Sequence, residues 1–182
     1  SLAGRAVIIE LDGFSLSEWR AEKTGAKSWL EEWIESPERF SVRHLGAKAA
    51  VPSVPLLEYI FRGSLPDAVS LPLSVLRDFH QAYIRTYVER DVRSLAALAD
   101  QQQFGQFYRL LAAMTAQEIN HAHLGREIGV AGKTAKHWLS IMQGTFQWKE
   151  IPAFHRNVVK RVSGKPKGYF SDTGLACAAQ GI

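Results

Sequence analysis

The sequence has little of several features that mark large classes of proteins. It contains one cysteine, Cys177, which excludes a disulfide framework and any zinc site built from several cysteines. No apolar run approaches about 18 residues, so we expect no membrane-spanning helix. The short apolar run at residues 6–9 is too small for the core of a signal peptide. Together these features indicate a cytoplasmic protein in a reducing environment.

Motifs for catalysis and metal binding are also scarce. Gly132-Lys133-Thr134 ends like a phosphate-binding loop, but Glu127 stands where that loop needs its first glycine. His121 and His123 are two positions apart, so on a helix they point in different directions and cannot chelate a metal well. We therefore expect no enzyme activity, no metal site and no bound cofactor in this chain, and we expect it alone neither to bind nor to hydrolyse ATP.

The 182 residues are sufficient for a packed core. Hydrophobic residues make up 46% of the chain, which excludes a disordered tail. The chain begins at Ser1 and the apolar residues 6–9 follow almost at once, so we expect it to be a piece of a longer gene product.

Positive charge is concentrated in one segment. Residues 132–168 hold eight Lys or Arg residues and one acidic residue, Glu150, so this segment carries a net charge of +7. Because the whole chain carries +4, the remaining residues carry −3. A basic block on a mildly acidic body is typical of a face that binds a polyanion. The alternative is a solvated surface that is basic without binding anything.

Periodicity and local stop signals predict a mainly helical chain. A short apolar strand over residues 5–11 precedes a helix start at Ser15, where Glu18 completes a capping box. Further helices are expected over residues 28–35, 55–62, 72–98 and 102–116, with a loop over residues 46–55 and a turn over residues 63–66. In the longest helix the expected apolar stripe is Leu73, Leu76, Phe79, Tyr83, Tyr87 and Val88.

Residues 120–143 have the pattern of a helix-turn-helix. A first helix is expected over residues 121–128, and Gly129 supplies the left-handed residue that turns the chain. A second helix then starts near Lys133, with an apolar face of Ala135, Trp138, Leu139 and Met142. Trp138 is expected to be buried between the two helices and a following sheet. The alternative is a helical hairpin whose outer face is only solvated.

The opposite face of the second helix and the segment after it supply candidate nucleic-acid contacts. Residues 145–151 and 167–170 are expected to pair as two strands, and the basic connection between them is typical of a wing that reaches phosphates. A final helix is expected to begin at the cap Asp172. The candidate binding residues are Lys133, Thr134, Lys136, His137, Ser140, Arg156, Lys160, Arg161, Lys165 and Lys167.

Several motifs resemble a family of bacterial and archaeal AAA-type ATPases in which a P-loop domain precedes a helical domain of unknown function with a winged-helix core. The matching residues are 1–5, 87–93, 129–139, Asn157 and 165–175. The resemblance covers nearly the whole chain and departs from the family at Gly63-Ser64, where two glycines are usual. It implies a parent protein with an ATPase domain, this helical region and a nuclease-like tail, in which ATP and magnesium bind outside this chain.

The same resemblance implies two links to the nucleotide. Arg5 would approach a phosphate as a sensor or finger, and the alternative is a surface arginine beside a strand. Glu89-Arg90-Asp91 would pass the nucleotide state to the winged helix, and the alternative is a structural ion network.

The expected fold is mainly α: a helical bundle followed by a winged helix-turn-helix with a small two-stranded wing. Residues 1–18 would be the edge of an ATPase domain, residues 19–116 the helical domain and residues 117–182 the winged helix-turn-helix. The expected function is a non-catalytic module that binds nucleic acid, with duplex DNA as the partner. The alternative is a regulatory lid on its own ATPase domain, and either function is compatible with an oligomer. An open basic face favours DNA, whereas a face covered by residues 72–116 favours the lid.

Overall fold

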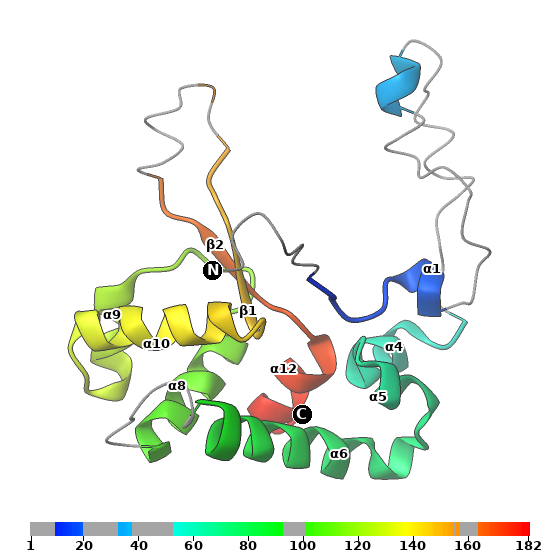
Figure 1. The fold of residues 1–182 in the computed structure, drawn as a ribbon, viewed down its shortest axis with the longest axis horizontal. Coiled ribbons are helices and arrows are strands. Elements are labelled where there is room, and N and C mark those ends of the chain that lie inside the picture. The colour runs from blue at the N-terminus through cyan, green and yellow to red at the C-terminus, as the bar shows by residue number, and fades with distance from the viewer. Residues whose placement is uncertain (1–9, 20–32, 38–52, 93–100, 155, 157–163) are drawn as a thin grey trace, which may run out of the picture.

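The computed structural model describes residues 10–19, 33–37, 53–92, 101–154, 156 and 164–182. These residues form a mainly helical structure with one two-stranded antiparallel sheet, which confirms the mainly α prediction (Figure 1). None of their helices is long and apolar enough to cross a membrane. In chain order the elements are α1 (Leu16–Trp19), α4 (Leu56–Arg62), α5 (Pro66–Ser70), α6 (Leu73–Thr86), the π-helix η2 (Tyr87–Val92), α8 (Gln101–Ala113), α9 (His121–Ile128), α10 (Gly132–Gly144), β1 (Trp148–Ile151), β2 (Lys167–Phe170) and α12 (Thr173–Gln180).

The predictions near the N-terminus are tested only in part. Glu10 and Leu11, the last residues of the expected strand, are not in a strand, and the rest of that strand lies outside the described residues. The capping box is confirmed, because the Ser15 amide donates to Glu18 Oε2 at 2.8 Å and the Glu18 amide donates to Ser15 Oγ at 3.4 Å. Of the helix expected over residues 28–35, only residues 33–35 are described, and they are helical.

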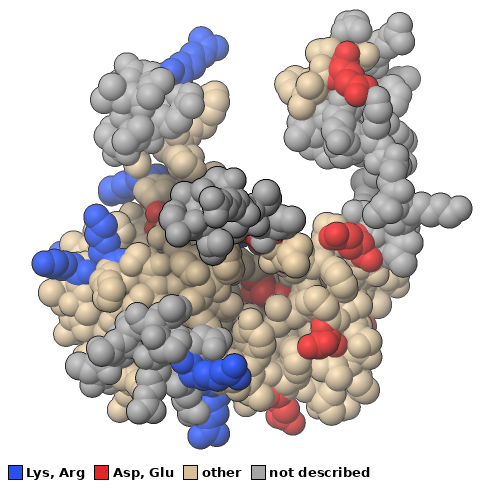
Figure 2. Space-filling view, viewed as in Figure 1, with Lys and Arg blue, Asp and Glu red and all other residues tan. Residues whose placement is uncertain are grey.

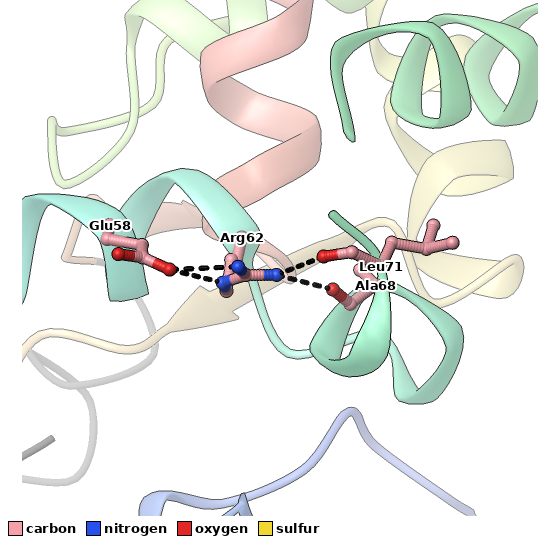
Figure 3. A network of polar contacts seen from close by, with 4 residues as sticks. All are labelled: Glu58, Arg62, Ala68 and Leu71. Atoms are coloured by element: carbon pink, nitrogen blue, oxygen red, sulfur yellow. Dashed lines mark hydrogen bonds and ion pairs between the residues drawn. The ribbon is translucent and has the colours of Figure 1, made fainter. Parts of the chain in front are cut away.

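Arg62, the last residue of α4, makes hydrogen bonds that connect α4 with α5 and with the start of α6. Its Nε donates to Glu58 Oε1 at 2.8 Å, and its Nη1 donates to the carbonyl oxygens of Leu71 at 2.6 Å and Ala68 at 3.4 Å (Figure 3). Ala68 belongs to α5 and Leu71 precedes α6, so the guanidinium fixes both helices against α4. The sequence predicted only a turn here, and α5, which begins at Pro66, is additional.

The helix predicted over residues 72–98 is helical through Val92, where the described part of it ends, and it changes character after Thr86. α6 ends at Thr86, and the chain continues as the π-helix η2 to Val92, while residues 93–100 lie outside the described part. The Tyr87 hydroxyl lies 2.7 Å from Thr145 Oγ1, immediately after α10. The π-helix therefore anchors the C-terminal end of α10 on the helical bundle.

The face that α6 turns toward the core differs from the predicted apolar stripe. Leu76 and Tyr87 are buried as expected, but Leu73 is 48% exposed and Tyr83 is 36% exposed. The fully buried His80 lies on the inward face instead, one turn after Leu76. The predicted stripe was wrong at Leu73 and Tyr83 because the prediction considered only apolar side chains and therefore left out His80.

His80 is enclosed where α6 meets α12. A side chain on Gly174 would place its Cβ 2.6 Å from His80 Cε1, so only glycine permits this approach. Neither ring nitrogen makes a hydrogen bond to the described residues. Burial lowers the pKa of His80, while the nearby Asp172 carboxylate and the Arg62 carbonyl partly oppose this by favouring the protonated form.

This environment predicts a stability that depends on pH. The pKa of an unfolded histidine is near 6.5 and that of His80 in the fold is lower, so the unfolded state binds more protons between the two values. We expect the contribution of His80 to the free energy of unfolding to be largest above pH 6.5 and to decrease as the pH falls below that value. Urea unfolding at pH 7.5 and pH 5.5 measures this. The loss of stability between pH 7.5 and pH 5.5 should be smaller in His80→Asn and in His80→Leu than in the parent protein. If both variants lose as much stability as the parent, His80 is not the source of the pH dependence.

The two helices and the sharp turn predicted within residues 120–143 are present, and the helices pack against each other. The Asn120 side chain caps α9 by accepting from the amides of Ala122 at 3.0 Å and His123 at 3.1 Å. Gly129 ends α9 in the left-handed conformation, with φ 73° and ψ 29°, as predicted. α10 begins at Gly132, one residue before the predicted start.

The small sheet has a partner that the sequence did not predict. β1 and β2 pair antiparallel with Trp148 opposite Phe170 and Ile151 opposite Lys167, and β2 has the predicted bounds. α8 ends at Ala113, three residues early, and residues 116–119 run along β2. Three backbone bonds hold this segment: Ala116 N to Gly168 O at 2.8 Å, Gly168 N to Gln117 O at 3.0 Å, and Ile119 N to Pro166 O at 2.9 Å.

Aromatic rings fill the core between the helix-turn-helix and the rest of the molecule. Trp138 is 5% exposed, which confirms its burial, but its ring meets Phe104 and Phe107 of α8 edge-on, with centroids 5.6 Å apart in each case. The tryptophan on the sheet is Trp148, which packs against Phe170 at 6.2 Å. Trp138 and Trp148 belong to the same core, and the aromatic partners of Trp138 come from α8.

The C-terminal helix packs against segments that lie far from it in the sequence. Asp172 caps α12, as predicted, by accepting from the Leu175 amide at 2.8 Å. Its other oxygen accepts from the amide of Ser64 at 2.6 Å and from the Ser64 hydroxyl at 2.9 Å. α12 contacts α4, α6 and α8, so the last helix packs together with the helices that begin at residue 56. The division into domains at residues 18 and 116 stays a prediction.

Candidate nucleic-acid interface

The sequence left open whether the outer face of α10 is exposed or covered, and in the described structure it is exposed. The apolar residues Ala135, Trp138, Leu139 and Met142 are buried, so the helix is rotated as expected. On the other side Lys133, Lys136, His137 and Ser140 are exposed, and Thr134 is half-buried. The Ser140 hydroxyl donates to the His137 carbonyl oxygen at 2.7 Å, which leaves the hydroxyl oxygen as an acceptor.

Three of the predicted binding lysines lie around one shallow depression. Its volume is about 530 Å³, and Lys133 and Lys136 of α10 line it together with Lys165, which precedes β2. The remaining lining residues are Ile119, Asn120, His121, Ala122 and Gly132. The paired segments 116–119 and 166–168 bring Lys165 to α10, so the strand-like segment missed by the sequence analysis assembles this site.

Backbone groups add to the positive potential of the depression. α10 starts there at Gly132, and its N-cap residue, Ala131, offers no side-chain acceptor to the first amides. Uncapped amides at a helix N-terminus favour anions. The three lysines and these amides therefore favour an anion such as a phosphate over a cation at this depression.

A second depression continues this surface along α9. Its volume is about 310 Å³, and it shares Asn120 and Lys165 with the first. His123 and Arg126 line it on one side of α9, and His123 Nε2 lies 3.6 Å from Glu127 Oε1. His123 and Arg126 are not among the predicted nucleic-acid contacts, although their spacing of three on a predicted helix places them on the same face.

The predicted residues of the wing are only partly described. Arg156 and Lys167 are exposed, while Lys160 and Arg161 lie outside the described residues. Lys149 of β1 is also exposed and pairs with Asp12 at 2.6 Å. Figure 2 shows Lys and Arg mainly on the side of α8, α9, α10 and the hairpin, and Asp and Glu mainly on the side of α1, α4 and α5. The charge separation expected from the sequence is thus also a separation in space.

Two other predictions concern residues or sites elsewhere. Arg5 lies outside the described residues, as do the side chains of Glu89 and Asp91. In the described part of the chain no three His, Cys, Asp or Glu side chains group closely enough to hold a metal ion.

Two proteins of known sequence are similar to the whole chain. One is an uncharacterized protein of Mycobacterium tuberculosis and the other an uncharacterized protein of Mycobacterium bovis, and each is 25% identical over all 182 residues. The chain spans 34% of the length of each of these relatives. No solved structure matches the chain.

The family comparison covers most of the described structure. The matching family model begins at residue 55, just before α4, and extends through residue 182. It therefore includes the bundle, the helix-turn-helix, the hairpin and α12. By this match the chain belongs to the family described as a domain of unknown function, DUF8612.

Proposed function

We propose that this chain is a non-catalytic nucleic-acid-binding module of the winged-helix type, within a larger AAA-type ATPase. The observation that carries the proposal is the open depression where Lys133, Lys136 and Lys165 come together beside the outer face of α10. Lysines around a helix N-terminus bind backbone phosphates, while polar side chains further along the helix face reach the bases.

The order of elements supports the winged-helix assignment. A helix, a strand-like segment, two helices joined by a sharp turn and a β-hairpin follow one another as α8, residues 116–119, α9, α10 and β1–β2. In this arrangement α10 is the recognition helix and the connection between β1 and β2 is the wing.

The lid alternative receives less support. It expects the basic face of α10 to be covered by the helices over residues 72–116, yet in the described structure α8 packs on the opposite, apolar face through Phe104 and Phe107. A parent ATPase domain would bind ATP and magnesium outside this chain, with Arg5 as a sensor or finger. The proposed location is the cytoplasm.

A salt titration with matched charge variants tests this function. If about four to six basic groups contact phosphates, log affinity for duplex DNA plotted against log salt should have a slope near −4 to −5. The double variant Lys136→Ala with Lys165→Ala should flatten the slope by about two, because two phosphate contacts are lost. The control, Arg77→Ala with Arg109→Ala, removes the same charge from α6 and α8 and should leave the slope unchanged.

Two outcomes would contradict the proposal. One is undetectable binding at about 50 mM salt and micromolar protein, where non-specific binders register. The other is equal weakening by both double variants, which would mean that net charge, and not the depression, determines binding.

A further inference from the structure

The hairpin has an outer face on which apolar and basic side chains alternate. Directly opposite residues of an antiparallel pair lie on the same face, so Lys149 with Tyr169 and Ile151 with Lys167 share one side. Trp148 and Phe170 occupy the other side and are buried in the core. The outer face is therefore the side directed away from the core.

Two apolar side chains of this hairpin are left in water. Ile151 is 57% exposed, and Phe154, shortly after β1, is 89% exposed. Trp148 and Phe170 already fill the inner face, so neither Ile151 nor Phe154 is needed to complete the core. The hairpin extends from the body (Figure 1). The exposure of both side chains makes them accessible to a ligand.

Basic residues lie beside these apolar groups and lead to the lysine depression, although Glu118 also lies opposite Lys167. Lys167 lies directly across from Ile151, and Arg156 is close to Phe154 in the sequence. Lys165, two residues before Lys167, lines the depression beside α10. A nucleic acid bound at the depression would therefore continue onto the outer face of the hairpin.

An intact duplex offers little apolar surface to Ile151 and Phe154, because the faces of its bases are stacked on one another inside the helix. Base faces become available where strands separate, and aromatic side chains bind them by stacking. Apolar side chains such as Phe and Ile also insert at opened base steps. The exposed Phe154 and Ile151 can therefore contact unpaired bases, while the basic residues beside them contact the flanking phosphates.

We propose that Phe154 and Ile151 form a wedge that contacts unpaired bases, so that the module prefers DNA with a duplex-to-single-strand junction over an intact duplex. This inference rests on the proposed function and defines its substrate class. Lys165 and Lys167 hold the backbone at the junction, while Phe154 stacks on the first unpaired base.

The test compares a forked duplex with a blunt duplex of the same nucleotide count, so that the number of phosphates is equal. 2-Aminopurine at the first unpaired position reports stacking by its fluorescence. We expect the fork to bind about tenfold more tightly, within the range that stacking of one base on an aromatic ring supplies. Phe154→Ala should lower fork affinity to that of the blunt duplex and abolish the fluorescence change, with the salt slope unchanged.

Controls separate this inference from the proposed function. Phe154→Trp should keep the preference for the fork, and Phe146→Ala, which removes a 51% exposed phenylalanine before β1, should not affect it. If the parent binds fork and blunt duplex equally, the wedge is wrong and the proposed function stands. If neither DNA binds, both are wrong. A preference for the fork that survives Phe154→Ala also overturns the wedge.

Discussion

Trp138→Ala should lower the free energy of unfolding by about 3–5 kcal/mol, the usual cost of removing a large aromatic side chain from a core. The indole is 5% exposed and meets Phe104 and Phe107 edge-on at 5.6 Å, so its loss leaves a cavity between α8 and α10. For a chain of this length, the melting temperature should fall on the order of 10 °C. Thermal and urea unfolding measure both quantities.

A matched aromatic substitution controls for the change in composition. Phe154 is 89% exposed, so Phe154→Ala should alter stability by less than about 0.5 kcal/mol. If Trp138→Ala melts within a degree or two of the parent, the proposed packing of α10 on α8 is wrong. The same result would remove the reason for placing Lys133 and Lys136 on the open face.

Asp172→Ala should be comparably damaging, although it removes no apolar surface. The carboxylate is 5% exposed and accepts bonds from the Leu175 amide, the Ser64 amide and the Ser64 hydroxyl. Without it, the start of α12 loses its cap and the turn before α5 loses its attachment. Unsatisfied donors of this kind cost about 1–3 kcal/mol each, so we expect a loss of about 3–5 kcal/mol in urea unfolding.

The variant Asp172→Asn has nearly the same volume as the parent side chain but no charge, so comparing it with Asp172→Ala shows how much of the loss comes from hydrogen bonds. Asp172→Asn keeps one carbonyl acceptor and remains a good helix cap, so its loss should be about half that of Asp172→Ala or less. Ser64→Ala removes only the hydroxyl bond and should cost about 1 kcal/mol. An Asp172→Ala variant as stable as Asp172→Asn would mean that the hydrogen bonds accepted by Asp172 do not stabilise the fold.

Local signals in the sequence were sufficient for several elements. The left-handed Gly129, the cap Asp172, the bounds of β2 and the rotation of α10 were predicted because each depends on residues within a turn or two along the chain. The exposure of Lys133, Lys136, His137 and Ser140 follows from the same periodicity. Their function as nucleic-acid contacts stays a proposal.

Only the tertiary structure decided which distant residues meet. His80 is buried because Gly174 of α12 allows its approach, and Asp172 bonds Ser64 across 108 positions of the chain. Trp138 meets Phe104 and Phe107 of α8, and Lys165 joins Lys133 and Lys136 because residues 116–119 pair with β2. Periodicity and capping determine which side of an element faces inward, but partners across the chain depend on how the elements pack, which no local pattern in the sequence contains.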